Sequence, residues 1–159
     1  MSEWDALGRL AVAALLGGVI GFERETLDKS AGLRTHMLVA LGSALFIVSS
    51  ILLVAEYGSP SSSAPADPTR IGSTIVTGIG FLGGGLIFRD RERVQGLTTA
   101  AGLWVAAAVG LAAGSGFYII SVGSVALTLV ILVLMRRVES LTEKWSTRPG
   151  RSPSESSDG

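Results

Sequence analysis

Residues 97–135 read LTTAAGLWVAAAVGLAAGSGFYIISVGSVALTLVILVLM, and this uncharged run sets the class of fold that the chain adopts. As a single helix, a run of about 39 residues would measure about 58 Å, far more than the ~30 Å hydrocarbon core of a bilayer. Its middle holds Gly114-Ser115-Gly116, where glycine disfavours a continuing helix. We therefore expect two membrane-spanning helices here, Leu97–Ala113 and Phe117–Met135, joined by a turn at this triplet.

Three more stretches of similar length and apolarity precede this run. They are Ala6–Phe22, Thr35–Ala55 and Ile71–Phe88. The sequence thus predicts an all-α integral membrane protein, a bundle of about five transmembrane helices. Residues 1–137 are expected to form this transmembrane domain. Residues 138–159 end in a segment rich in Ser, Pro and charge, and are expected to form a short cytoplasmic tail that is largely disordered.

Arginine and lysine are concentrated in alternate links between the stretches. The link after the second stretch holds one cation, Arg70, and the link after the fourth holds no charge. The remaining link cations follow the first, third and fifth stretches: Arg24, Lys29 and Arg34, then Arg89, Arg91 and Arg93, then Arg136, Arg137 and Lys144. Because cytoplasmic loops carry the excess of Lys and Arg, the N-terminus is predicted outside and the C-terminus in the cytoplasm.

Composition excludes several classes of function. The chain has no cysteine and a single histidine, so thiolate sites and a zinc site built from histidines are excluded. The 13 Lys and Arg balance the 13 Asp and Glu, which leaves no basic field for nucleic acid. No nucleophile–base pair or metal cluster is visible, so neither an enzyme nor a resident cofactor is predicted. No Asp or Glu lies inside a stretch, so a divalent cation would need a wet site lined by glycine carbonyls.

Glycine spacing indicates how the helices pack. Gly102, Ala106, Gly110 and Gly114 are four residues apart, so they share one helical face and predict a packing seam. The third stretch has two interpretations. Its helix either stays intact and packs through Gly80 and Gly84, which is the commoner use of membrane glycine, or breaks at Gly83-Gly84-Gly85 and exposes carbonyls to a cavity.

Charged residues at the ends of the stretches are the candidate functional groups. Glu23 directly follows the first stretch, and we interpret it either as part of a solvated loop or as a buried partner of Arg34 beside Thr35. In the loop after the second stretch, Asp67 precedes a proline, a pattern that predicts a helix start. Arg70 then lies in the first turn, where the helix dipole disfavours a cation, so Asp67 or Glu56 is an expected partner. Arg70 is interpreted as a structural clamp or as a ligand contact.

Three further polar residues have simpler interpretations. Arg9 lies four residues after Asp5, so both can share a helical face as an ion pair, with Arg9 reaching toward water; a place in a pathway is the alternative. Glu25, like Glu23, is a candidate cap for the exposed N–H groups that begin the second helix. His36 is expected at the membrane interface rather than on a metal.

A faint repeat joins the two halves of the chain. Gly32-Leu33-Arg34-Thr35 precedes the second stretch, and Gly96-Leu97-Thr98-Thr99 precedes the fourth. The two pairs of stretches would then be parallel repeats. Similar requirements at a helix start could also produce this likeness independently.

Five motifs together resemble the MgtC/SapB family, and the resemblance covers about residues 8–115. The motifs are Gly21-Phe22-Glu23-Arg24-Glu25, Ala31-Gly32-Leu33-Arg34-Thr35-His36, Arg70-Ile71, Gly78-Ile79-Gly80-Phe81-Leu82-Gly83-Gly84-Gly85-Leu86-Ile87 and Gly96-Leu97-Thr98-Thr99-Ala100-Ala101-Gly102-Leu103-Trp104. The resemblance implies a multi-pass protein of the bacterial inner membrane, with a role in magnesium transport or homeostasis and Mg²⁺ as a substrate or ligand. The alternative is a non-transporting regulator that binds other membrane proteins.

The resemblance also implies a polar signature. By motif, its members are Glu23, Arg34, Thr35, Arg70 and Thr98. This chain has Gln95 where an arginine is common in the family, and Thr98 where some members have asparagine. Many members continue into a soluble C-terminal domain, whereas only a short tail follows Met135 here. The expected surroundings are the lipid bilayer, with other membrane proteins or a homo-oligomer as partners.

Overall fold

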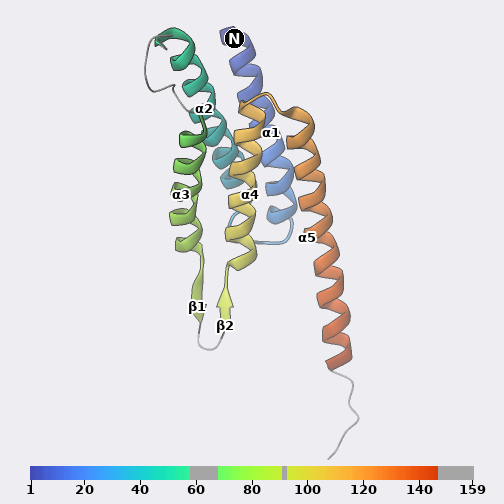
Figure 1. The fold of residues 1–159 in the computed structure, drawn as a ribbon. Helices are drawn as coiled ribbons and strands as arrows, with labels where there is room; N and C mark the ends of the chain where they lie inside the picture. Colours follow the sequence, from blue (N-terminus) through green and yellow to red (C-terminus); the bar gives the residue numbers. More distant parts are fainter. Residues whose placement is uncertain (58–67, 91–92, 147–159) are drawn as a thin grey trace, which may run out of the picture. The chain divides into compact units, whose positions relative to one another are not determined.

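The computed structural model describes residues 1–57, 68–90 and 93–146, and the described part is built from helices (Figure 1). The helices are α1 (Glu3–Glu25), α2 (Leu33–Tyr57), α3 (Pro68–Leu86), α4 (Leu97–Gly114) and α5 (Tyr118–Ser146). The predicted all-helical fold is confirmed.

Four of these helices are long and apolar enough to cross a membrane: α1, α2, α4 and α5 as far as Glu139. The third predicted stretch is also a helix, but it does not meet the same criterion. Its glycines, its threonines and Arg70 keep the mean hydropathy of an 18-residue stretch of α3 below that found in the other four helices.

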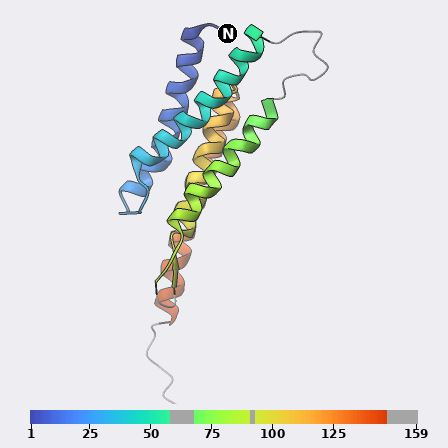
Figure 2. The same cartoon turned by 90° about the vertical axis from the view of Figure 1, so that its left-hand side faces the viewer.

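The sequence did not predict the short hairpin that links α3 to α4. Strand β1 (Phe88–Asp90) pairs antiparallel with β2 (Arg93–Gln95), and the hairpin extends beyond the end of α3 (Figure 2). In this ladder Phe88 lies opposite Gln95. The third apolar stretch was expected to run as one helix to Phe88, and this boundary is wrong. The helix ends at Leu86, where the Ile87 N–H donates to the Gly84 carbonyl at 3.3 Å, and Phe88 already belongs to the ladder.

The chain divides into two compact units, residues 1–129 and 130–159. Within the second unit, the end of α5 exposes a run of large apolar side chains from Val130 to Met135, as suits a lipid-facing helix. Residues 138–146, which were assigned to the tail, continue α5 as helix. The rest of the predicted tail, residues 147–159, lies outside the described residues. The boundary at residue 137 stays a prediction.

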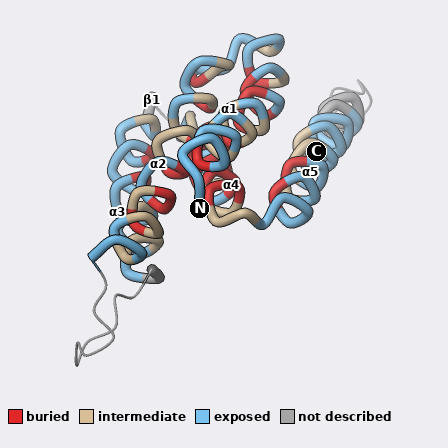
Figure 3. The backbone as a smooth tube through the Cα atoms, turned by 90° about the horizontal axis from the view of Figure 1, so that it is seen from above, coloured by how far each residue is buried: buried red, intermediate tan, exposed pale blue. Residues whose placement is uncertain are grey.

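In the first unit, α1, α2 and α4 pack together, and their buried positions face one another (Figure 3). The predicted α4 ladder is confirmed as a packing seam, and its partner is α2. A Cβ added to Gly110 would strike the Ala40 carbonyl, and one added to Gly114 would lie 2.6 Å from the Ile47 Cγ2 atom. The backbones of α2 and α4 can approach this closely only because side chains are missing there.

The turn between α4 and α5 is also confirmed. Gly116 has φ +89°, which favours glycine, and the Phe117 N–H donates back to the Ala112 carbonyl at 2.9 Å. The Gly116 N–H donates to Ala113 at 3.0 Å, and the two bonds together form a Schellman motif. This motif ends α4 at Gly114.

The expectation for the third stretch is half right. Helix α3 is continuous through Gly83-Gly84-Gly85, as its packing interpretation required. However, a Cβ added to Gly80 or Gly84 would meet nothing within 4 Å, so this pair makes no packing contact with another described helix of the same chain. The face of α3 that meets α4 carries Gly72 and Gly83 instead, and Gly80 and Gly84 are turned away from it.

Candidate functional site

A buried ion pair lies at the end of the bundle where α1 ends and α2 and α4 begin, here called the Glu23 end. Arg24 contacts Glu23 through two guanidinium nitrogens, each 2.5 Å from the same carboxylate oxygen. Only 4% of Arg24 is exposed. Arg24 was not among the predicted site residues. Its spacing from Gly17 and Gly21 nevertheless places it on the α1 face that packs against α2.

His36 is fully buried beside this pair, in the first turn of α2, and its predicted depth at the membrane interface stays a prediction. Its backbone packs against Gly17 and its Cβ against Gly21 of α1, while the imidazole Nε2 atom faces Gly102 of α4, where no side chain intervenes. Its Nδ1 atom lies 2.9 Å from the Gly32 carbonyl, whereas its Nε2 atom has no hydrogen-bond partner in the described structure. His36 therefore joins three helices at the Glu23 end.

Arg34 and Thr35 lie on the opposite, exposed side of α2. We expected Arg34 to pair with Glu23, but the ion pair recorded for Glu23 is with Arg24. Arg34 and Thr35 instead line a groove of about 750 Å³ between α2 and α3. Both residues therefore border the same groove. Arg34 lies on a different side of α2 from His36, whose side is buried.

Glu25 caps the start of α2, and it is one of the two residues that were predicted as candidate caps. Its Oε2 atom accepts a hydrogen bond from the Leu33 N–H at 2.9 Å. A Cβ on Gly32 would collide with this carboxylate oxygen, so the cap requires glycine at that position.

The remaining predicted site residues are not gathered into one site. Arg70 is exposed at the start of α3, where its carbonyl accepts hydrogen bonds from the hydroxyls of Ser73 and Thr74 at 2.7 and 3.0 Å. Asp67 lies outside the described residues, so its pairing with Arg70 stays a prediction. Thr98 is exposed in the first turn of α4, whereas its neighbour Thr99 is buried.

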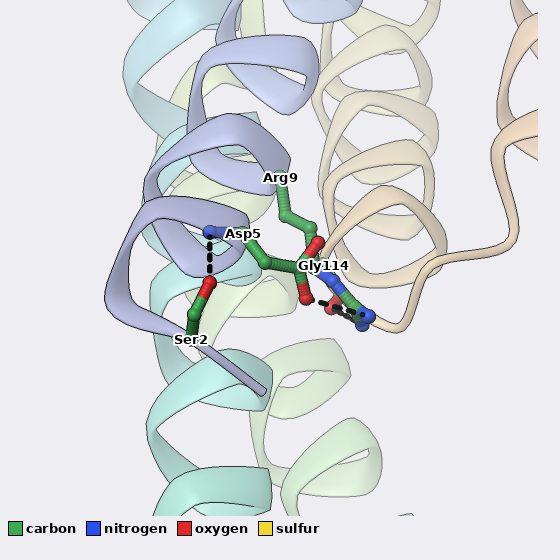
Figure 4. Close-up of polar contacts among 4 residues, drawn as sticks. All are labelled: Ser2, Asp5, Arg9 and Gly114. Atoms are coloured by element: carbon green, nitrogen blue, oxygen red, sulfur yellow. Dashed lines mark hydrogen bonds and ion pairs between the residues drawn. The ribbon is translucent and has the colours of Figure 1, made fainter.

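At the other end of the bundle, Arg9 joins α1 to the end of α4 (Figure 4). Its Nη2 atom lies 3.2 Å from the Asp5 carboxylate, which confirms the predicted ion pair. Its Nη1 atom donates to the Gly114 carbonyl at 3.1 Å, a contact that the sequence did not suggest. A cation at a helix C-terminus is favourable, so Arg9 acts here as a structural clamp.

Side chains that could bind a metal ion are not clustered in the part of the chain that the structure describes. No group of three or more His, Cys, Asp or Glu there could hold a metal ion. The Glu23 carboxylate, only 14% exposed, is held by Arg24, whose positive charge opposes binding of a cation beside it. What the Glu23 end offers is a buried, charged junction of three helices.

Comparison with known proteins places these features in a family. A sequence profile of the MgtC family matches residues 10–141. The chain is 41% identical over 134 residues to "Putative magnesium transporter YhiD" of Escherichia coli K12, which covers 82% of this chain and 60% of that protein. It is 46% identical over 143 residues to "Protein MgtC" of Brucella abortus, which covers 89% of this chain and 56% of that protein.

A cyanobacterial relative is similarly close. "Uncharacterized protein slr0014" of Synechocystis is 43% identical over 135 residues, covering 84% of this chain and 54% of that protein. The chain thus spans little more than half the length of these curated relatives. No solved structure matches it.

Proposed function

This chain belongs to the MgtC family, and from that premise we propose that it works in magnesium homeostasis as a multi-pass protein of the bacterial inner membrane. The four long apolar helices support the membrane location. The name of the Escherichia coli relative, which describes a magnesium transporter, supports the link to magnesium.

Its mode of action in this proposal is regulatory. The protein contacts another membrane component and does not carry Mg²⁺ along its own helices. One observation carries this choice: the Glu23 carboxylate at the end of the α1, α2 and α4 core is already bound by Arg24. Mg²⁺ is bound in proteins by oxygen ligands, usually with carboxylates among them, and a guanidinium beside the carboxylate opposes a divalent cation.

Transport of Mg²⁺ is the second candidate, and the exposed glycines of α3 favour it. Around Gly80 and Gly84 no atom would touch an added Cβ, so this face of α3 is free of contacts within the described structure. A second copy packed there would bring further backbone close to α3 and could enclose a wet path. Such a path would belong to an assembly rather than to one chain.

Growth at low magnesium tests the role in homeostasis. A bacterium that lacks its own family member is expected to recover growth in low-magnesium medium when it expresses this chain. Glu23→Gln is expected to abolish that recovery while the protein still accumulates in the membrane, because the buried junction loses its ion pair. Glu3→Gln, an exposed change at the other end of α1, is the matched control and should support growth fully.

Two results would contradict the proposal. Failure of the unchanged chain to support growth, despite normal membrane levels, would remove the role in homeostasis. Full growth support by Glu23→Gln would instead show that the Glu23 end is not the working site.

A further inference from the structure

A groove runs between α2 and α3, and the proposed role in magnesium homeostasis does not use it. Its α2 wall includes Leu38 and Phe46, and its α3 wall includes Ile75 and Leu82. Among the described residues that line it, apolar side chains and glycines predominate. Its charged end is formed by Arg34 and Thr35, and the hydroxyl residues Ser43 and Thr74 also line it.

Two glycines hollow the groove without serving helix packing. Gly42 of α2 and Gly78 of α3 both line it, and an added Cβ at either would meet nothing within 4 Å. The glycines of the α2–α4 seam behave differently, since a Cβ on Gly110 would strike the backbone of α2. The space at Gly42 and Gly78 is therefore available to another molecule.

The length of the groove matches one leaflet of a bilayer. On α2 it runs from Arg34 to Phe46, about 18 Å at ~1.5 Å per residue, which is close to half of a ~30 Å hydrocarbon core with the headgroup contact at Arg34 added. A partner helix that crossed the membrane would need a seam along the full thickness. A lipid acyl chain, which ends at the middle of the bilayer, needs only this length.

The charge at the end of the groove indicates the headgroup. Arg34 is exposed in the first turn of α2, at the edge of a membrane-crossing helix, and it makes no ion pair with a described residue. Guanidinium groups bind phosphate through paired hydrogen bonds, and the neighbouring Thr35 hydroxyl is a further donor. Basic side chains at a membrane edge also attract anionic lipids.

We propose that the groove between α2 and α3 binds one anionic phospholipid, with its phosphate at Arg34 and Thr35 and one acyl chain between Gly42 and Gly78. This site does not depend on the role in magnesium homeostasis. It would give the protein a preference for phosphatidylglycerol over a zwitterionic lipid with the same chains.

Native mass spectrometry of the purified protein, titrated with phosphatidylglycerol or with phosphatidylcholine of identical chains, tests the site. The unchanged protein is expected to hold one phosphatidylglycerol more tightly than phosphatidylcholine. Arg34→Gln should weaken phosphatidylglycerol binding about fivefold and phosphatidylcholine binding less, because the choline ammonium already opposes the guanidinium and the preference for the anionic lipid is lost with it. Lys29→Gln, which removes a nearby exposed cation outside the groove, should keep the preference.

A second pair of variants tests the acyl chain. Gly78→Leu fills the groove and should weaken both lipids, whereas Gly80→Leu adds the same side chain on the same helix outside the groove and should weaken neither. Retention of the phosphatidylglycerol preference by Arg34→Gln, or equal behaviour of the two leucine variants, would overturn the proposal. So would a dimer in the unchanged protein that Gly78→Leu abolishes, because a second copy would then occupy the groove.

Discussion

Arg24 places a full positive charge in the packed end of α1, where it forms an ion pair with the carboxylate of Glu23. Charge at such a place is costly unless it is paired, and removal of one partner of a buried pair destabilises more than removal of both. His36 is a second sensitive residue, because it fills the space left by glycines on two other helices. Both residues make the Glu23 end sensitive to single changes.

Arg24→Met is expected to lower the free energy of unfolding in detergent by about 3 kcal/mol, because Glu23 loses its guanidinium partner inside the packed end. The double variant Glu23→Leu with Arg24→Met should be less destabilised than Arg24→Met alone. Chemical denaturation of the purified variants measures this. Equal or greater destabilisation of the double variant would show that the pair is not energetically coupled.

Arg9 provides a second prediction at this scale. Arg9→Gln removes both the ion pair to Asp5 and the hydrogen bond to the Gly114 carbonyl, and should cost about 1.5 kcal/mol. Asp5→Asn removes only an exposed ion pair and should cost less than about 1 kcal/mol. Thermal unfolding of the two variants distinguishes the contributions. If Asp5→Asn is as destabilising as Arg9→Gln, the bond to Gly114 contributes nothing.

At the scale of the elements, missing side chains do two opposite things. On α4 and α1 they bring backbones together against α2, as at Gly110 and Gly17. On α3 and the outer side of α2 they leave open surface, as at Gly78 and Gly42. The sequence alone does not separate these uses, because both appear as small residues at helical spacing.

Gly110→Leu should therefore prevent normal packing of α4 on α2 and cost at least about 3 kcal/mol, since the new side chain meets the Ala40 backbone. Gly80→Leu, where an added Cβ meets nothing, is the matched control and should change stability little. Expression level and thermal stability in detergent report the difference. Comparable stability of the two variants would mean that the α4 ladder is not a close seam.

The sequence predicted the elements well because their signals are local. The turn at Gly114-Ser115-Gly116, the α4 seam and the Glu25 cap all depend on residue type and spacing within one segment. The helices α2 and α4 begin directly after Gly32 and Gly96, as the short repeat suggested.

Partners between helices were harder to predict, because they depend on how each helix is rotated about its axis. Arg24 rather than Arg34 meets Glu23, since the packed face of α1 includes Arg24 and the exposed face of α2 includes Arg34. The prediction of which α3 glycines pack on a neighbouring helix missed for the same reason. Gly72 and Gly83 face α4, whereas Gly80 and Gly84 do not. Helical spacing defines a face but not the neighbour that the face meets.

At the scale of the whole molecule, orientation in the membrane is still a prediction from loop charge. A reporter fused after Lys144 should read cytoplasmic, and one inserted near Ser62 should read external. Ser62 lies outside the described residues, in the link between α2 and α3. A cytoplasmic signal at Ser62 would contradict the predicted topology.

Regulation without transport is the central claim about the whole molecule, and Mg²⁺ flux tests it most directly. The purified chain, reconstituted into liposomes that contain a Mg²⁺-sensitive dye, is measured under an imposed Mg²⁺ gradient. The account predicts uptake no faster than in protein-free liposomes, from a preparation whose gene supports growth at low magnesium. Protein-dependent uptake that Glu23→Gln abolishes would contradict the account and establish transport instead.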